Sequence, residues 1–371
     1  MHSDALDATY EVRRYRPEDR AGVLALDDAV WDRNRGGRWF DWKYGQNPYV
    51  DHVPLFVAVR GDEVVGARPF MAFRLRAGDE TALALQPADT MVDPDHRRQG
   101  IFTRMTERAI EFYRERGVEL FFNFPNEASL PGYRKLGWRT VDDKRTFYRV
   151  QSPDAFVPQY TDGRAATLLG QLAAPIVRGY HDVRTELAQP PPELSIDRRA
   201  GVDADALAEL YRRNRPNQLH AHRDAEFYGW RFDSPVWSHS TYVAAADGDP
   251  TLGLVTRTRT TNDGITIAQI AEVVPMNGGR RWREALAELL GDALADHADA
   301  DVVAITGAVV PDDVLTDYGF APDDRLPLSK FSDHRCALVV RPLDGDSWSL
   351  NGRDLTRSVN WLLSYGERDT T

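Results

Sequence analysis

The stretch Met91-Val92-Asp93-Pro94-Asp95-His96-Arg97-Arg98-Gln99-Gly100-Ile101-Phe102-Thr103 places a strand end, a polar loop and a helix start in direct succession. The first turn of a helix has N–H groups without intrahelical partners, and the helix dipole adds partial positive charge there. A diphosphate can accept hydrogen bonds from these groups, while Gly100 allows close approach of the backbone. Arg97 and Arg98 add charge that can meet phosphates. The stretch predicts an anion-binding loop, with an ordinary basic loop that caps a helix as the alternative.

A second polar block follows this helix. The apolar positions of residues 101–116 recur at helical spacing, Gly117 ends the helix, and residues 118–124 predict a buried strand. The block itself reads Asn126-Glu127-Ala128-Ser129-Leu130-Pro131-Gly132-Tyr133-Arg134-Lys135-Leu136-Gly137-Trp138. Tyr133 therefore falls on a short predicted helix, seven residues after Asn126.

Together the two blocks resemble the GNAT acetyltransferase superfamily, whose element order is similar to that of residues 10–150. The first resembles its valine-x-proline strand end followed by Arg/Gln-x-x-Gly-x-Gly/Ala, with Arg97 and Gly100 at the first and fourth positions. Phe102 departs from the pattern at the sixth position, where the family usually has Gly or Ala. The second resembles the segment from Asn to Tyr-x-Lys-Leu-Gly-aromatic.

The resemblance implies an acetyl-CoA cleft where two parallel strands, here 89–92 and 118–124, separate. It implies that the amides of Met91 and Val92 hold the pantetheine arm and polarise the thioester carbonyl. Asn126 would bind the same arm, and Tyr133 would protonate the departing thiolate. Arg97 adds charge beside the pyrophosphate, which would lie on the amides of Arg98, Gln99, Gly100, Ile101, Phe102 and Thr103.

The acceptor amine needs a base. A lysine-like amine is mostly protonated at pH 7, and removing that proton costs about 4.6 kcal/mol. Asp89 precedes the cofactor strand, so its carboxylate is the candidate base, with Asp93 and Glu127 also near. The alternative for Asp89 is a turn or strand-end residue after Pro87.

A local repeat predicts duplicated domains. Trp42-Lys43-Tyr44 returns as Trp230-Arg231-Phe232, and a hairpin follows each copy, with turns at Gly61-Asp62 and Gly248-Asp249. We expect two α/β (α+β) GNAT-like domains, each a mixed, mostly antiparallel sheet flanked by helices. The predicted boundaries are 1–151 for a catalytic domain, 152–193 for a linker with a helix, 194–342 for a degenerate domain and 343–371 for a tail.

In the second half of the chain, the residues before the corresponding helix do not follow the Arg/Gln-x-x-Gly-x-Gly/Ala pattern of the family. This segment reads Val273-Val274-Pro275-Met276-Asn277-Gly278-Gly279-Arg280-Arg281-Trp282, and we interpret the second half as a degenerate domain that shapes the acceptor pocket. In the tail, Leu355, Val359, Leu362 and Leu363 predict an amphipathic helix.

The amino-acid composition limits the classes of partner that we expect for this protein. The net charge is −11, which opposes general nucleic-acid binding and also fits the acidic surfaces of salt-loving organisms. We find no apolar run long enough for a membrane helix and no signal-peptide core, and the single Cys336 fits a reducing cytoplasm. His220 and His222 form no metal-ligand pattern with the other histidines, so we expect no metal.

These observations predict an acetyl-CoA-dependent N-acetyltransferase that acts on a small-molecule primary amine by direct transfer. Two alternatives remain: a non-catalytic acyl-CoA-binding sensor or interaction module, and a tRNA-dependent aminoacyl transferase that resembles FemX. We expect no nucleic-acid or membrane partner, and homo-oligomerisation stays open.

Overall fold

The computed structural model describes residues 10–33, 35–152, 177, 179–181, 183–188, 194–326, 328–330, 336–343, 345 and 347–369. The chain forms two compact units. Unit 1 comprises residues 1–142, 233–235 and 336–360, and unit 2 comprises 143–232, 236–335 and 361–371. Both contain mixed, largely antiparallel sheets flanked by helices, which confirms the predicted fold class.

The sheet of unit 1 has the strand order β1-β2-β3-β4-β6-β16-β7, and β5 pairs with β3 beside this path. The strands are β1 (Glu11–Arg14), β2 (Leu55–Arg60), β3 (Glu63–Ala77), β4 (Glu80–Pro87), β5 (Met91–Val92), β6 (Leu120–Asn123), β7 (Arg139–Lys144) and β16 (Cys336–Pro342). Strands β1 to β4 are antiparallel neighbours, whereas β4 and β6 run parallel.

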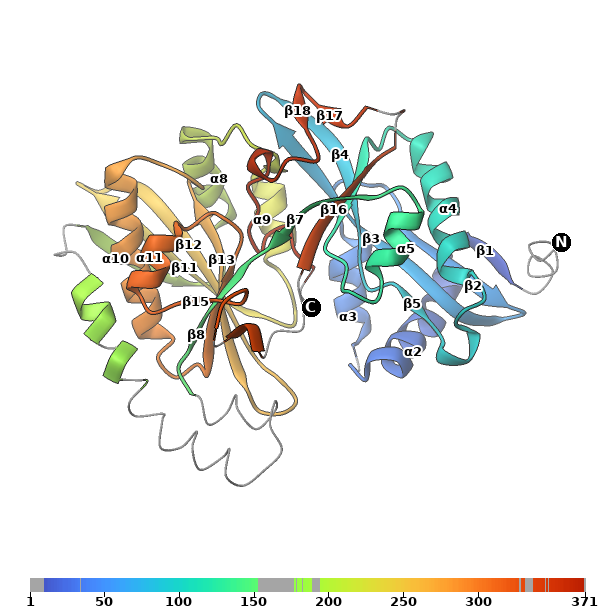
Figure 1. Ribbon diagram of the computed structural model, residues 1–371, viewed down its shortest axis with the longest axis horizontal. Helices are drawn as coiled ribbons and strands as arrows, with labels where there is room; N and C mark the ends of the chain where they lie inside the picture. The colour runs from blue at the N-terminus through green and yellow to red at the C-terminus, as the bar shows by residue number, and fades with distance from the viewer. Residues whose placement is uncertain are drawn as a thin grey trace. The chain divides into compact units, whose positions relative to one another are not determined.

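Helices cover both faces of this sheet (Figure 1). They are α2 (Arg20–Trp31), α3 (Gly37–Phe40), α4 (Ile101–Arg114) and α5 (Leu130–Lys135), with 3-10 turns at Pro17–Asp19 and Pro94–His96 and a π-helical turn at Asp41–Gly45. Gly22 of α2 lies against Val64, whereas Gly66 lies against Ile101 and Met105 of α4. The missing Cβ atoms let the two helices approach β3 closely.

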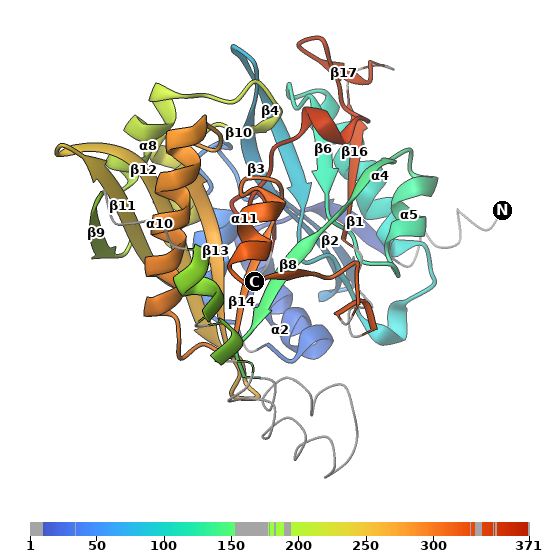
Figure 2. The same cartoon turned by 60° about the vertical axis from the view of Figure 1, so that its left-hand side comes forward.

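The sheet of unit 2 has the order β15-β8-β14-β13-β12-β11-β9, with a parallel pair formed by β13 and β14. The strands are β8 (Thr146–Val150), β9 (Ser195–Ala200), β11 (Ser238–Ala246), β12 (Asp249–Thr260), β13 (Thr266–Val274), β14 (Val302–Thr306) and β15 (Ala321–Pro322), with β10 (His220–Ala221) elsewhere in the unit. The helices are α8 (Ala204–Arg213), α9 (Ala225–Arg231), α10 (Arg280–Asp296) and α11 (Asp312–Asp317), with a 3-10 turn at Leu328–Lys330. Figure 2 shows α10 lying along this sheet.

The structure divides the chain differently from the predicted boundaries. β8, placed by prediction in the first domain, pairs with β14 of unit 2. β16, placed by prediction in the second domain, pairs with β6 of unit 1. A strand pairs with any sheet edge that offers free N–H and C=O groups, so distance along the chain does not decide its sheet.

The predicted helix in the tail is replaced by other elements. The chain forms β17 (Ser349–Leu350), β18 (Arg353–Asp354) and one 3-10 turn at Ser358–Asn360. Leu355 is buried in unit 1 and Leu362 in the core of unit 2, whereas Val359 is 68% exposed. The apolar residues do not share a helical face because they belong to two cores.

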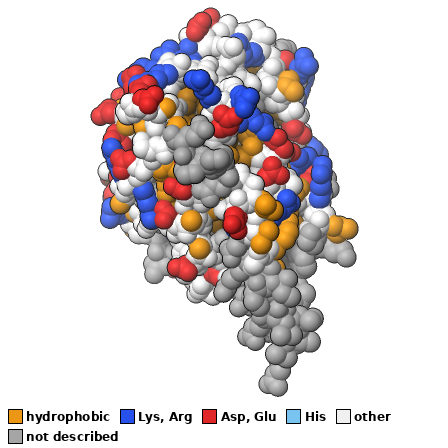
Figure 3. Space-filling model, turned by 90° about the vertical axis from the view of Figure 1, so that its left-hand side faces the viewer, with side chains coloured by type: hydrophobic (Ala, Val, Ile, Leu, Met, Phe, Trp, Pro, Cys, Tyr) orange, Lys and Arg blue, Asp and Glu red, His pale blue; other side chains and the backbone are white. Residues whose placement is uncertain are grey.

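Three further findings bear on the sequence expectations. Of the predicted linker 152–193, the structure describes residues 152, 177, 179–181 and 183–188, and all of these except residue 152 are helical. The face drawn in Figure 3 carries interspersed basic and acidic side chains, without a continuous patch of one sign. None of the helices in the described residues combines the length and hydrophobicity that crossing a bilayer requires.

Candidate active site

The parallel strands β4 and β6 separate where the sequence predicts the cofactor cleft. Their register runs through Ala84 opposite Leu120 and Leu85 opposite Phe121, after which the chain leaves β4 and forms β5 against β3. The amide of Asp93 donates to Val65 O at 2.9 Å. N–H groups alternate between the two edges of a strand, so the Val92 amide points away from β3 and the Met91 amide points toward it. Of the two amides predicted to bind the pantetheine arm, that of Val92 is the one directed to the edge of β5 that does not pair with β3.

The loop after β5 is held in shape by its own side chains. Arg97 Nε donates to Val92 O at 3.1 Å, so this guanidinium ties the loop to β5. Tyr10 OH lies 2.9 Å from His96 Nδ1 and donates to Gln99 Oε1 at 2.9 Å. The side chains of Arg97 and Gln99 therefore organise the loop, and both Arg97 and Arg98 are exposed to solvent.

The start of α4 fits an anion. Arg98 (φ +63°) and Gly100 (φ +75°) both have left-handed backbone, and no side chain caps the helix. The first intrahelical bond is donated by the Arg104 amide to Gly100 O at 3.0 Å, which leaves the amides of Ile101, Phe102 and Thr103 ahead of it. A Cβ at Gly100 would have no atom within 4 Å, so the space beside this turn is open.

Phe102, the departure from the family pattern, is accommodated by a glycine on the facing helix. Its ring packs toward α5, with its centroid 5.6 Å from that of Tyr133. A Cβ at Gly132 would lie 3.0 Å from this ring, closer than ordinary contact. The large side chain thus occupies space that the missing Cβ of Gly132 leaves.

Tyr133 is 2% exposed and reaches from α5 toward the separated strands. Its hydroxyl oxygen accepts a hydrogen bond from Arg68 NH1 at 3.2 Å, and the same nitrogen donates to Thr90 Oγ1 at 3.1 Å. The bonds join α5 to the start of β5. A phenol whose oxygen is held by a cation has its own proton available for another acceptor.

Asn126 holds the turn that precedes the short helix α5. Its Oδ1 accepts bonds from the amide of Ser129 at 3.0 Å and from Ser129 Oγ at 2.8 Å. The oxygen is therefore engaged within the protein, and the NH2 group is the half of the side chain suited to a ligand.

Asp89 lies in a cluster of cations. Its backbone has φ +36°, and its carboxylate accepts bonds from Lys43 Nζ and from Tyr44 OH at 2.8 Å. Arg35 NH1 is 3.1 Å from Oδ1, and Arg33 NH1 is 3.4 Å from it. Burial alone would raise the pKa of Asp89, but Lys43 and Arg35 outweigh burial and hold that pKa below its usual range. A carboxylate so stabilised is a weak proton acceptor, so these surroundings do not favour the predicted role of general base.

A second buried carboxylate adjoins this cluster. Asp27 of α2 is 1% exposed, and its Oδ1 lies 3.8 Å from Arg35 NH1. Burial raises the pKa of Asp27 to about 6. Arg35 therefore lies between two carboxylates of unequal basicity.

Sequence reasoning missed Arg68, Lys43 and Asp27 as members of this region. Arg68 had a usable signal, because it interrupts the apolar β3 stretch Val64-Val65-Gly66-Ala67-Arg68-Pro69-Phe70. Lys43 belonged to the repeated Trp42-Lys43-Tyr44 motif, although nothing in the motif indicated a partner. Asp27 had no signal in the sequence, because an aspartate on a helix is ordinarily solvated.

Comparison with known proteins identifies the family of this site. Residues 11–141 match the acetyltransferase (GNAT) domain family. Residues 11–141 form a GNAT domain. Over 72 residues the chain is 33% identical to the N-alpha-acetyltransferase RimI of Mycobacterium tuberculosis, a match that covers 19% of this chain and 46% of that protein. The chain thus spans less than half the length of this relative.

Solved structures extend the likeness in fold beyond the GNAT domain. A GCN5-related N-acetyltransferase from Anabaena variabilis has TM-score 0.58 and 12% identity, covering 90% of this chain and 73% of that one. A probable N-acyltransferase from Enterococcus faecalis has TM-score 0.61 and 10% identity, covering 91% and 73%. Saccharomyces cerevisiae N-myristoyltransferase with bound myristoyl-CoA has TM-score 0.60 and 14% identity, covering 90% and 78%. These likenesses concern the fold of both units.

The position in unit 2 that corresponds to the GNAT loop is built differently. Gly279 precedes α10 with extended backbone (φ −85°, ψ −157°), unlike the left-handed Gly100. Trp282 packs against Gly278, where a Cβ would lie 2.4 Å from the Trp282 side chain, and the Nε1 of Trp282 donates to Pro275 O at 2.8 Å. An indole therefore covers Gly278, one of the two glycines that precede this helix.

The C-terminal segment 361–369 lies beside the ends of β13 and β14 in unit 2. Gly307 (φ +86°) follows β14, and a Cβ there would lie 1.8 Å from Leu363 O. Arg231 donates to Gly366 O at 2.8 Å and to Arg368 O at 2.6 Å. Arg223 pairs with Glu367 and, at 3.0 Å, with Glu272 of β13, and all three side chains are fully buried. The chain itself thus packs against the end of this parallel pair.

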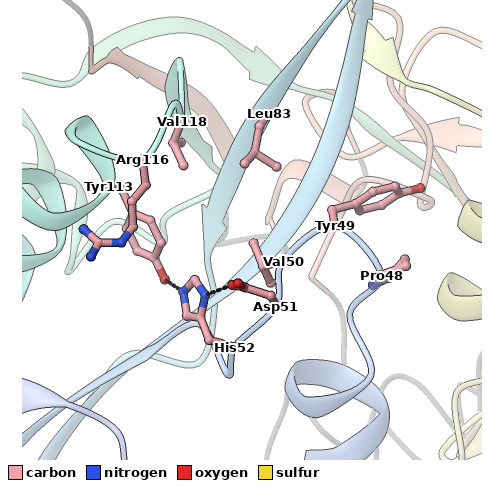
Figure 4. A pocket seen from close by; sticks show the side chains of 9 residues that line it. All are labelled: Pro48, Tyr49, Val50, Asp51, His52, Leu83, Tyr113, Arg116 and Val118. Carbon is pink, nitrogen blue, oxygen red and sulfur yellow. Dashed lines mark hydrogen bonds and ion pairs between the residues drawn. The ribbon is translucent and has the colours of Figure 1, made fainter.

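A separate cavity of about 600 Å³ lies at the other end of the GNAT domain (Figure 4). His52 lies between Asp51 Oδ1, at 2.9 Å from Nδ1, and Tyr113 OH, at 3.3 Å from Nε2. Burial raises the pKa of Tyr113, and the hydrogen bond with His52 lowers that of Asp51. Tyr113 is near the C-terminus of α4, about 20 Å along the helix from the turn at Gly100. Among the described residues, no group of His, Cys, Asp and Glu could hold a metal ion.

Proposed function

We propose that the GNAT domain transfers an acetyl group from acetyl-CoA directly to a small-molecule primary amine. The observation that carries this proposal is the order of three features around the point where β4 and β6 separate. The uncapped, left-handed turn at Gly100 offers amides to a pyrophosphate, the Val92 amide points to the open edge, and the Tyr133 hydroxyl is held at the far side. A pyrophosphate, a pantetheine arm and a thioester occur in this order in acetyl-CoA.

The proposed chemistry needs one proton donor and one oxyanion donor. The amine lone pair attacks the thioester carbon, and the carbonyl oxygen gains negative charge that the Val92 amide stabilises. The carbon–sulfur bond then breaks with its electron pair on sulfur, and Tyr133 gives its proton to the thiolate. A thiol pKa of about 8.5 and a phenol pKa of about 10 are close enough for this transfer. The ammonium nitrogen of the tetrahedral intermediate loses its extra proton to water as the amide forms, and a proton from solvent restores the phenol.

Asp89 has a different part in this proposal. Its carboxylate neutralises Lys43 and Arg35 where β4 turns into β5, so it anchors the turn that aims the Val92 amide. The amine is expected to enter as the minor neutral form or to lose its proton through water.

Calorimetry of acetyl-CoA binding tests the proposal. Wild type, Gly100→Trp and Gly279→Trp are titrated at moderate and high salt, the latter because of the acidic composition. We expect one site in the wild type, abolished by Gly100→Trp and unchanged in the matched variant of unit 2. Absence of binding to the folded wild type at both salt concentrations would refute the proposal, as would equal loss in both variants.

Thiol release with a panel of amines then distinguishes transfer from binding alone. Aminosugars, polyamines, amino acids and peptide N-termini are compared, with myristoyl-CoA as a second donor because one structural neighbour was solved with it. Turnover of one amine class supports the enzyme. Tight binding of acetyl-CoA without thiol release for any amine would instead indicate a non-catalytic acyl-CoA sensor.

A further inference from the structure

Arg68 is a fully buried cation at the end of the cleft where Tyr133 lies. It projects from β3 with 0% exposure, on the side of Phe102 and Tyr133. Its NH1 makes both of its hydrogen bonds, to Thr90 Oγ1 and Tyr133 OH. One nitrogen therefore joins β5, on one side of the cleft, to α5 on the other.

The rest of the guanidinium lacks partners. Nε and NH2 are buried without a hydrogen bond, and among the described residues Arg68 forms no ion pair with a carboxylate. These two nitrogens share the edge that ordinarily grips an anion. The rings of Phe102 and Tyr133, 4.9 and 5.1 Å from the guanidinium carbon, compensate part of the charge. A buried cation without an anion is costly, which points to an anion supplied by a ligand or a reaction step.

We propose that Arg68 is a positioning residue for thiol release, an inference that rests on the proposed acetyl transfer. By donating to the phenol oxygen, Arg68 leaves the phenol proton as the group that faces the sulfur. When the carbon–sulfur bond breaks, that proton moves to sulfur, and negative charge passes to the phenol oxygen 3.2 Å from Arg68 NH1. The cation stabilises first the thiolate and then the phenolate.

The position of the sulfur follows from the same bonds. A sulfur within hydrogen-bond reach of the Tyr133 hydroxyl lies roughly 6 Å from the Arg68 cation, since each bond spans about 3 Å. An opposite charge within about 4–6 Å lowers the pKa of a neighbouring acid. Bound coenzyme A should therefore ionise at its thiol more readily than coenzyme A in solution.

An ultraviolet titration of the bound thiol tests this inference. Coenzyme A is bound to wild type, Arg68→Lys, Arg68→Met and Tyr133→Phe, and thiolate absorbance is followed from pH 6 to 10. The complex with desulfo-coenzyme A, which lacks the thiol, is subtracted to remove the absorbance of the protein's own phenolates. We expect a thiolate-to-thiol ratio about tenfold or more above that of free coenzyme A in wild type and Tyr133→Phe. Arg68→Lys should keep much of the increase, and Arg68→Met should lose it.

Comparing kcat with the Kd for acetyl-CoA distinguishes a role in thiol release from a purely structural role. Arg68→Met should lower kcat about 10²-fold or more while the Kd for acetyl-CoA changes less than about threefold. Arg68→Met combined with Tyr133→Phe should lose less than the product of the two single losses, because both residues act on the departure of the same thiolate. Arg68→Gln, which keeps a donor without charge, replaces Arg68→Met if that variant does not fold.

The outcomes separate the two proposals. Failure of the folded wild type to bind coenzyme A would overturn the proposed function and this inference with it. Binding with overlapping titration curves for wild type and both uncharged variants would overturn only the role of Arg68. Loss of coenzyme A affinity in the uncharged variants, with unchanged thiol ionisation, would likewise assign Arg68 to folding or binding.

Discussion

Glu272 and Glu367 are buried carboxyl groups beside the C-terminal segment of unit 2. Replacing Glu367 by glutamine should lower the free energy of unfolding, whereas replacing Glu272 by glutamine should change how that free energy depends on pH. Arg223, Glu272 and Glu367 are all fully buried, so one positive charge faces two carboxyl groups. Glu367 accepts bonds from both Arg223 NH1 and NH2 and from the backbone amides of Ala221 and Ser364, each amide at 2.9 Å. Glu272 receives the remaining side of the same guanidinium, at 3.0 and 3.2 Å.

Glu367→Gln should be the more damaging change. It removes the charge that lies closest to Arg223 and turns an acceptor of backbone bonds into a group that is half donor. Breaking one partner of a buried ion pair costs about 3–5 kcal/mol. The free energy of unfolding of unit 2 should fall by about this amount near pH 7.

Glu272→Gln should act through pH instead. Burial raises the pKa of Glu272 to about 7, which Glu367 reinforces and Arg223 opposes. The folded protein therefore holds a proton that the unfolded chain, with an ordinary pKa of 4.5, releases. The raised pKa of Glu272 thus adds about 3 kcal/mol to the free energy of unfolding. This stabilisation is fully present below pH 4.5 and declines as the pH rises to about 7. Glu272→Gln should remove this decline and be near neutral or stabilising at pH 8.

Urea unfolding from pH 5 to 8 measures these effects. Hydrogen exchange by mass spectrometry on peptides from β13 and residues 361–369 assigns the transition to unit 2, since a chain with two units need not unfold in one step. Equal cost of both substitutions at every pH would refute the reasoning. A wild-type stability that rises between pH 5 and 7, with no difference in Glu272→Gln, would do the same.

Three further substitutions test packing and charge within single units. Gly132→Ala should destabilise unit 1 by about 1–3 kcal/mol, because its Cβ meets the Phe102 ring at 3.0 Å, and Phe102→Leu in the same chain should recover most of the loss in thermal unfolding. Asp89→Asn should cost about 3–5 kcal/mol in urea unfolding by leaving buried cations without their anion, and full stability in that variant would contradict the anchoring role. Gly307→Ala should raise hydrogen exchange in residues 361–369, because its Cβ would overlap Leu363 O; unchanged protection would show that the segment does not pack there.

The local segments of the site could be predicted because short-range physics decides them. The left-handed conformation of Gly100 follows from a tight turn into a helix, and hairpin turns at Gly61-Asp62 and Gly248-Asp249 connect β2 to β3 and β11 to β12 as expected. Tyr133 lies on a short helix after a buried strand, as predicted. Such features depend on residues within about one turn of each other.

The environments of the same residues could not be predicted. Gln99 and Arg97 organise the loop because Tyr10 and Val92 O lie beside them, and Asp89 is enclosed by cations from residues 33–43. Tyr10 is 89 positions from Gln99, and Lys43 and Arg33 are 46 and 56 positions from Asp89, so no local pattern indicates these contacts. A pKa depends on burial and on neighbouring charges, so the lowered pKa of Asp89 could be recognised only in the folded protein.

The sequence by itself determined the fold class, the order of the GNAT elements and the positions of Gly100 and Tyr133. Only the tertiary structure decided that β8 and β16 pair with different sheets from those predicted, that the C-terminal segment packs beside β13 and β14, and that Arg68 holds Tyr133. The physical reason is that turns, caps and hydrophobic periodicity act between near neighbours in the chain. Strand pairing and buried charge depend instead on which unsatisfied groups meet once the chain is compact.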